Sequence, residues 1–213
     1  MAESRKRRAN GEASRQRILD AAAEIAGERG YEGTSINLVS ERSGLPASSI
    51  YWHFQDKDEL IAAVIDRSFQ RWTATLAEPV VVPDGASADD VFHLNLRRTG
   101  KALAEYPDFL RLGLLLLLER RPEEPTARAR FLRARHVTAA GVADLCHRAF
   151  PTLDDGAIEQ LVTLTMALAD GLFIAAETEH LALDDAFDLM ATAILNTARA
   201  FGHNPPRRPV PMS

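Results

Sequence analysis

The sequence GLPASSIYWHFQDKDEL, residues 44–60, is the most informative segment of this 213-residue chain. Gly44 suits the sharp turn of a helix–turn–helix, because glycine adopts positive φ without steric cost. The short helix predicted at 46–53 carries small polar and aromatic side chains instead of a full apolar stripe. Asp56 and Glu59 have the spacing of a capping box for the next helix. A short, weakly apolar helix between stronger ones is typical of a helix that enters the DNA major groove.

The segment resembles the DNA-binding domain of the tetracycline-repressor-like (TetR) family of bacterial regulators. That family's pattern has Thr-Thr, an apolar pair, a glycine turn, and then Leu-Tyr-x-His-Phe-x-x-Lys-x-x-Leu. The matching residues here are Thr34-Ser35, Ile36-Asn37-Leu38-Val39, Gly44-Leu45, Ile50-Tyr51-Trp52-His53-Phe54, Lys57 and Leu60, and the resemblance covers residues 14–62. Two positions depart from the pattern: Pro46 replaces the serine that usually caps the recognition helix, and Ser48 stands where glycine is usual.

Helical periodicity dominates the rest of the chain, which predicts an all-α fold. Apolar spacing and proline breaks indicate helices at 14–29, 35–43, 46–53, 56–77, 88–105, 107–120, 125–149, 155–179 and 184–202. Thr34 is the expected N-cap of the second of these helices. The three valines at 80–82 lie in a proline-bounded connection, and no partner strand is evident for them.

The resemblance divides the chain into four parts. Residues 14–62 form the three-helix helix–turn–helix DNA-binding domain, and residues 63–203 form a helical ligand-binding and dimerisation domain. Residues 1–13 are expected to be a flexible basic arm, because Arg5, Lys6, Arg7 and Arg8 are adjacent. A solvated start with no DNA contact explains those residues equally well. The tail at 204–213 contains four prolines in its last nine residues and is expected to be extended or disordered.

Composition is that of a cytoplasmic protein with no membrane partner. No signal peptide is visible, and the longest strongly apolar run, Leu112 to Leu118, is too short to span a bilayer. Cys146 is the only cysteine, so an intrachain disulfide cannot form, as expected in a reducing compartment. The net charge of −5 is unevenly placed: residues 1–58 hold nine basic and nine acidic side chains, so the remainder carries all of it. That asymmetry suits a DNA-binding end and an acidic body.

Enzyme signatures are missing from the sequence. It contains no Gly-x-Ser-x-Gly, no His-Glu-x-x-His and no phosphate-binding glycine-rich loop that ends in Lys-Ser/Thr. We therefore expect no catalytic residues, no metal site and no cofactor. An all-helical enzyme or scaffold with an incidental helix–turn–helix remains the alternative from a different class.

Candidate DNA contacts come from the recognition helix and its neighbours. By the resemblance, Tyr51 and His53 reach the DNA backbone or a base edge, and Lys57 binds a phosphate at the start of the fourth helix. Trp52 either packs or contacts DNA, whereas Ile50 and Phe54 are expected in the core. The full set is Thr34, Asn37, Ala47, Ser48, Ser49, Tyr51, Trp52, His53 and Lys57, with Arg5, Lys6, Arg7 and Arg8 of the arm.

Apolar residues of the second half suggest two further roles. An effector pocket is predicted from Trp72, Phe109, Leu112, Leu116, Phe131, Val137, Met166 and Phe173, although a packed core would use the same residues. A dimer interface in the last two helices is predicted from Leu161, Leu168, Leu172, Met190, Ile194 and Ala198, with an intramolecular core as the alternative.

These features predict a homodimeric repressor that a small, largely apolar effector releases from a palindromic DNA operator. An activator, or a DNA-binding regulator that needs no ligand, is the alternative within the same class.

Overall fold

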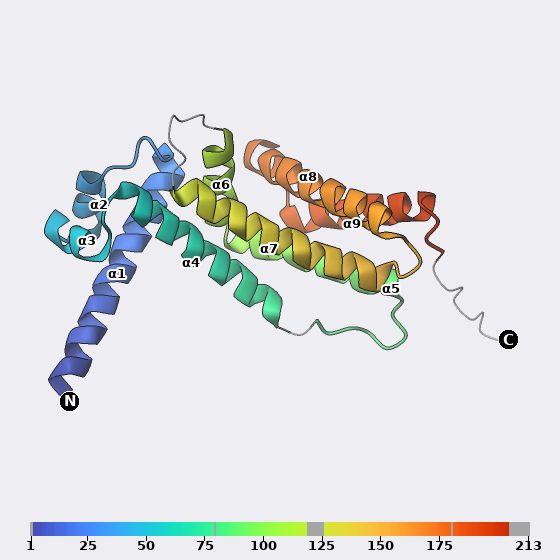
Figure 1. The fold of residues 1–213 in the computed structure, drawn as a ribbon, viewed down its shortest axis with the longest axis horizontal. Helices are drawn as coiled ribbons and strands as arrows, with labels where there is room; N and C mark the ends of the chain where they lie inside the picture. The colour runs from blue at the N-terminus through green and yellow to red at the C-terminus, as the bar shows by residue number, and fades with distance from the viewer. Residues whose placement is uncertain (1, 79, 119–125, 180, 205–213) are drawn as a thin grey trace. The chain divides into compact units, whose positions relative to one another are not determined.

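A computed structural model describes residues 2–78, 80–118, 126–179 and 181–204, with side chains from residue 9 onward. The described residues form only helices and their connections (Figure 1). The helices are α1 Ala2–Arg29, α2 Ile36–Ser43, α3 Ala47–His53, α4 Lys57–Ala77, α5 Ala88–Glu105, α6 Asp108–Leu118, α7 Thr126–Ala149, α8 Asp155–Glu179 and α9 Leu183–Ala200. The all-α prediction is confirmed.

The chain folds as two compact units, each built from two stretches of sequence. The first unit comprises Met1–Thr73 and Tyr106–Ala134, and the second comprises Ala74–Glu105 and Arg135–Ser213. Helices α4 and α7 therefore each contribute residues to both units. The sequence division at residue 62 does not match these units, because it followed chain order and could not foresee that α6 packs against α1.

Most predicted helix boundaries agree with the structure within about two residues, which is the usual uncertainty of helix ends. The exception is α1, which begins at Ala2 instead of residue 14 and passes α2 and α3 (Figure 1). The segment predicted as a flexible arm therefore has a helical backbone, since no proline interrupts the sequence there. Residues 119–120 of the sixth predicted helix and most of the proline-rich tail lie outside the described residues.

The first unit packs three helices against α1. Helix α1 contacts α2, α3 and α6, and it buries an apolar face that includes Ile18, Leu19 and Ile25. The N-terminus of α4 has the predicted capping box: the Glu59 backbone N–H donates to Asp56 Oδ1 at 2.8 Å, and the Gln55 N–H donates to Glu59 Oε2 at 2.6 Å. This box fixes where α4 begins after α3.

The second unit is built on α9, which packs along α5 and against α8. Gly100 of α5 makes the close approach possible, since a Cβ there would lie 2.5 Å from the Leu183 carbonyl oxygen and 2.8 Å from Phe187 Cγ. After α9, the buried imidazole of His203 contacts Asp89 Oδ1 at 3.1 Å, and Arg199 donates to the other oxygen of that carboxylate at 2.9 Å.

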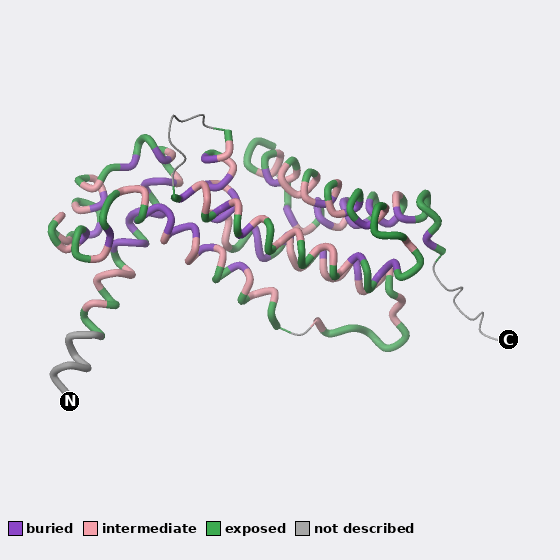
Figure 2. Tube along the Cα trace, in the orientation of Figure 1, coloured by how far each residue is buried: buried purple, intermediate pink, exposed green. Residues whose placement is uncertain are grey.

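Helix α8 is unusually apolar for its exposure. It is the one helix among the described residues that is long and apolar enough to cross a bilayer, with a mean hydropathy of 1.5 over its 18-residue window. Only 17% of that window is buried in the single chain, and Figure 2 shows mostly half-buried and exposed positions along it. The run Leu112–Leu118 is therefore not the most membrane-like segment, because α8 keeps a high hydropathy through small, uncharged residues between its leucines.

Candidate nucleic-acid interface

The turn between α2 and α3 has the geometry that the sequence predicts. Gly44 has φ of 65° and ends α2 in the left-handed conformation. The Ser40 hydroxyl donates to the Leu45 carbonyl at 2.7 Å, and the Arg17 guanidinium of α1 donates to the Ser43 carbonyl at 2.6 Å. Hydrogen bonds from α1 and α2 therefore hold the turn, and with it the start of α3.

The Thr34 side chain faces the protein interior, which does not favour the predicted DNA contact. Its side chain is buried, with 1% exposure, and its hydroxyl donates to the Gly30 carbonyl at 2.8 Å. The N-cap of α2 is Ser35, whose hydroxyl accepts from the Leu38 backbone N–H at 3.3 Å. Two adjacent hydroxyl residues made the cap position ambiguous in sequence, and only the packing of the α1–α2 turn shows which one faces inward.

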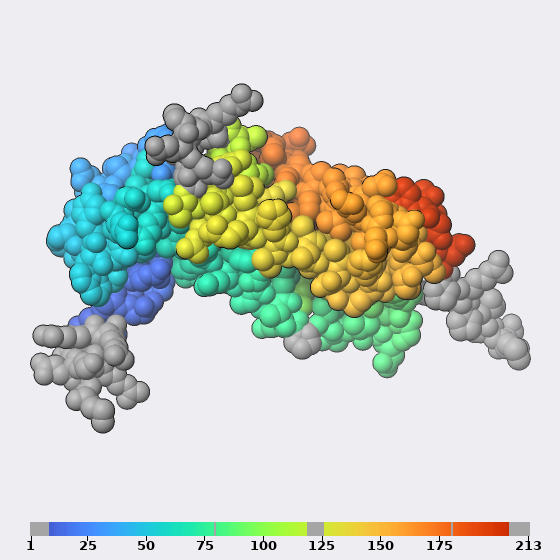
Figure 3. Space-filling view, in the orientation of Figure 1, coloured from blue at the N-terminus to red at the C-terminus, as the bar shows by residue number. Residues whose placement is uncertain are grey.

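Helix α3 lies at the surface in the cyan region of Figure 3, and it has a buried side and an exposed side with polar and aromatic residues. Ile50 and the C-cap residue Phe54 are buried, as predicted. Tyr51 is 57% exposed and Trp52 is 76% exposed, which shows that Trp52 lies at the surface instead of in the core. Ser48 of α3 is also exposed, as is Asn37 of α2. Ala47, Ser49 and His53 of α3 are half-buried. Pro46 is the N-cap of α3 and supplies no side-chain hydrogen bond.

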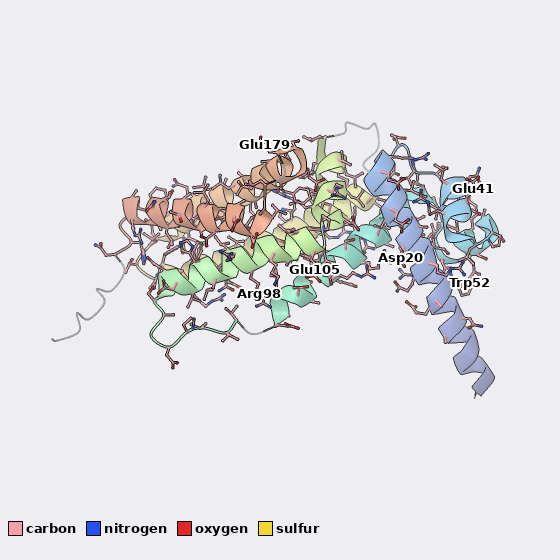
Figure 4. All side chains as sticks on the ribbon, turned by 180° about the vertical axis from the view of Figure 1, so that it is seen from behind. Asp20, Glu41, Trp52, Arg98, Glu105 and Glu179 are labelled. Atoms are coloured by element: carbon pink, nitrogen blue, oxygen red, sulfur yellow. The ribbon has the colours of Figure 1, made fainter. Side chains whose placement is uncertain are left out.

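A hollow of about 390 Å³ lies between α1 and α3. Its α1 wall is formed by Asn10, Gly11 and Ser14, and a Cβ at Gly11 would lie 3.7 Å from two carbons of the Trp52 ring. Trp52 is labelled beside α1 in Figure 4. The α3 wall is formed by Ser48, Ser49, Trp52 and His53. Asn10 and Gly11 were missed from sequence, because the predicted helix began only at residue 14.

His53 is a neutral imidazole near neutral pH. Partial burial lowers the pKa of His53 below its ordinary value of 6.5, and the nearby positive charge of Arg15 lowers it further, against a smaller opposing effect of Glu12. His53 therefore presents a hydrogen-bonding ring, not a cation, to whatever occupies the hollow.

Lys57 has partners within the protein. Its Nζ donates to the Tyr31 carbonyl at 3.2 Å, lies 4.3 Å from the centre of the Tyr31 ring and is 3.7 Å from a Glu32 carboxylate oxygen. These contacts hold the ammonium at the N-terminus of α4, where the sequence predicts a phosphate contact. Side chains of Arg5, Lys6, Arg7 and Arg8 lie outside the described side chains, so their DNA contact stays a prediction.

Residues 18–64 match the family model of bacterial regulatory proteins of the tetR family. Residues 18–64 therefore form a helix–turn–helix domain of the tetR type. The chain's 62-residue match to the HTH-type transcriptional regulator SrpR of Pseudomonas putida is 36% identical and covers 29% of each protein. A 65-residue match to the HTH-type transcriptional repressor AcnR of Corynebacterium efficiens is 35% identical and covers 30% of this chain and 35% of AcnR. The chain thus spans about a third of the length of these curated relatives.

Solved structures extend the TetR-like fold to the rest of the chain. A TetR-like transcriptional regulator from Rhodococcus sp. RHA1 is 18% identical, with a TM-score of 0.66 over 86% of this chain and 94% of that one. A Saccharomonospora viridis protein solved in complex with choline is 20% identical, with a TM-score of 0.66 over 92% of this chain and 100% of that one. At these identities the similarity establishes the fold alone.

Five of the predicted effector-pocket residues lie in the first unit. Trp72 stacks on Phe109 with ring centres 5.8 Å apart, and Phe109 contacts Phe131 at 5.1 Å and Phe69 at 5.0 Å. Leu112 and Leu116 are buried as well. The predicted lining also includes residues of the second unit, where Val137 is exposed, Met166 is half-buried and Phe173 is buried.

The predicted dimer residues divide by burial. Leu161 of α8 and Met190, Ile194 and Ala198 of α9 are already buried within one chain, so the intramolecular core accounts for them. Leu168 and Leu172 are half-buried. The exposed face of α8 instead carries Ala167, Gly171, Ile174 and Thr178. Sequence could not separate the two faces, because α8 and α9 are apolar on more than one side.

Proposed function

We propose that the chain is a DNA-binding transcriptional regulator, and most specifically a homodimeric repressor. The observation that carries the proposal is the surface of α3, where Tyr51, Trp52 and Ser48 are exposed while Ile50 and Phe54 anchor the helix from behind. Such a helix offers hydroxyl and aromatic groups to base edges and phosphates without loss of its core contacts. The repressor role is supported by the name of AcnR, a transcriptional repressor.

Self-association is supported by the exposed face of α8. Ala167, Gly171, Ile174 and Thr178 recur at i, i+4, i+7 and i+11, so they share one side of the helix. Leu189 of α9 is also exposed. An apolar helix that a single chain leaves mostly uncovered gains free energy when a second copy buries it. A two-fold dimer presents two recognition helices to the two halves of a palindromic operator.

A small effector is supported by the indole of Trp72. Its Nε1–H is buried and has no hydrogen-bond partner among the described residues, although aromatic rings surround it. A buried donor without an acceptor costs about 1–3 kcal/mol. A largely apolar effector with one acceptor oxygen would satisfy this donor. To test the contact, the release of Trp72→Phe from DNA by the effector is compared with that of the wild type, and we expect it to be weaker. The choline-bound structure shows a small ligand in a protein of this fold.

The proposed dimer also favours a cytoplasmic regulator over a membrane protein. A second copy of the chain would bury the apolar face of α8, so that this face needs no lipid. The proposal also favours a regulator over a catalyst, in keeping with the named relatives.

A mobility-shift assay on the DNA upstream of the chain's own gene tests the proposal. We expect binding that weakens steeply as salt rises, because phosphate contacts release counterions. Binding to random DNA with the same affinity would contradict a sequence-specific regulator. Deletion of the gene should raise transcription from the bound promoter, whereas a fall would identify an activator. Binding that no small molecule alters would leave a regulator that is not ligand-switched.

A further inference from the structure

Asp58, in the first turn of α4, joins this helix to the start of α7 and to the turn after α1, all in the first unit. Its Oδ2 accepts from the Thr126 backbone N–H at 2.5 Å, and its Oδ1 accepts from the Ala127 N–H at 3.3 Å. The Tyr31 hydroxyl, from the turn after α1, donates to Oδ1 at 3.3 Å. A side chain of α4 therefore binds the N-terminal backbone of α7, which lies 68 residues away in sequence.

The negative charge of Asp58 is favourable beside the N-terminus of α7. The first N–H groups of a helix have no partners within the helix, and the helix dipole favours a negative charge beside them. The acid thus satisfies donors of α7 while it holds the Tyr31 hydroxyl. An ion pair between the same two helices, Arg130 with Asp66 at 3.1 Å, lies further along α4.

Tyr31 links this junction to the candidate DNA contacts. It is buried, its carbonyl accepts from Lys57, and its ring lies under the Lys57 ammonium. Only residues 54–56 separate α3 from α4, and Phe54 among them is buried. A shift in the first turn of α4 relative to Tyr31 is therefore passed to Lys57 and to the end of α3.

We infer that Asp58 is a positioning residue: by holding α7 and Tyr31 together, it sets the placement of Lys57 and the recognition helix. This inference rests on the proposed function for its DNA readout. It predicts that loss of the Asp58 carboxylate loosens α3, although Asp58 does not touch DNA itself.

The test compares Asp58→Ala with Asp154→Ala in the full chain. Asp154 is a matched control, because its carboxylate accepts from the Ala157 N–H at 2.8 Å at the start of α8, in the second unit. Both variants lose a helix cap, and both should melt at a lower temperature. Only Asp58→Ala should speed amide hydrogen exchange in α3. It should also weaken operator binding about fivefold at a temperature where circular dichroism shows both variants folded.

A conservative variant separates positioning from general loss of stability. Asp58→Asn keeps an acceptor for one backbone N–H without the charge, so its exchange in α3 and its operator affinity should lie between wild type and Asp58→Ala. If Asp58→Ala and Asp154→Ala change α3 exchange and operator affinity equally, the inference is overturned. If the wild type binds no duplex DNA, the proposed function fails, and the exchange rates in α3 still decide whether Asp58 positions that helix.

Discussion

Gly113 of α6 lies directly against the ring of Phe131 of α7, so close that a Cβ at position 113 would be 2.0 Å from the ring carbon Cε2. The absence of a side chain at this one position lets the two helices meet, and it places Phe131 beside Phe109 and Trp72. The aromatic cluster therefore depends on a glycine in the middle of a helix, where glycine is otherwise unfavourable.

Gly113→Ala should destabilise the protein by about 1–3 kcal/mol, because the methyl group must displace a buried ring. Chemical denaturation measures the change in the free energy of unfolding. Gly141→Ala is the control, since a Cβ at this exposed position of α7 would meet nothing within 4 Å. That change should be neutral or stabilising by up to about 1 kcal/mol, from helix propensity alone. Equal effects of the two changes would show that the Phe131 ring moves aside freely.

Tyr51→Ala should weaken binding to the operator by about 1–3 kcal/mol and binding to random DNA by less, because base-edge contacts carry specificity. Tyr51 is exposed, so the melting temperature should not change. Fluorescence anisotropy on both duplexes measures the two affinities. Val81→Ala, at a position 90% exposed in the second unit, provides a surface control. An equal loss on both duplexes would assign Tyr51 to the DNA backbone.

Protonation of His53 should oppose folding and favour DNA binding. Because burial lowers the pKa of His53 below 6.5, the unfolded chain takes up a proton first as the pH falls. The stability that neutral His53 contributes is present above pH 6.5 and is lost as the pH falls below that value. On DNA, the imidazolium adds a positive charge beside phosphates. Operator affinity should therefore rise more between pH 7 and pH 5.5 for wild type than for His53→Gln, and parallel pH profiles would exclude His53 from the interface.

Ile174→Glu should convert the dimer to a monomer at micromolar concentration, because a second copy would bury an unpaired carboxylate at a cost of several kcal/mol. Ile174 is 49% exposed in the single chain, so the helical circular dichroism spectrum should be retained. Analytical ultracentrifugation measures the oligomeric state, and Val81→Glu is the control for an added surface charge. A wild type that sediments as a monomer while it binds its operator tightly would refute the dimer.

The Cys146 thiol should be inert in the folded protein. It is buried, and burial raises its pKa to about 11, so little thiolate is present at pH 8. A chromogenic disulfide reagent should label the thiol only as fast as the chain unfolds, and denaturant should make labelling immediate. Rapid labelling of the native protein would contradict this expectation and would indicate an accessible, reactive thiol.

The sequence alone determined the features that depend on neighbouring residues. The Gly44 turn, the Asp56–Glu59 capping box and nearly all helix boundaries follow from backbone preferences and apolar spacing within a few residues. The inward direction of Ile50 and Phe54 was predictable for the same reason.

Only the tertiary structure decided which side of each feature is free. It buried Thr34 and exposed Trp52, turned Met190 and Ile194 into the core of a single chain, and placed Asn10 and Gly11 beside α3. It also brought Asp58 to the start of α7. These outcomes depend on contacts between residues distant in sequence, and a local pattern that is apolar or polar on several sides does not specify which partner will cover it.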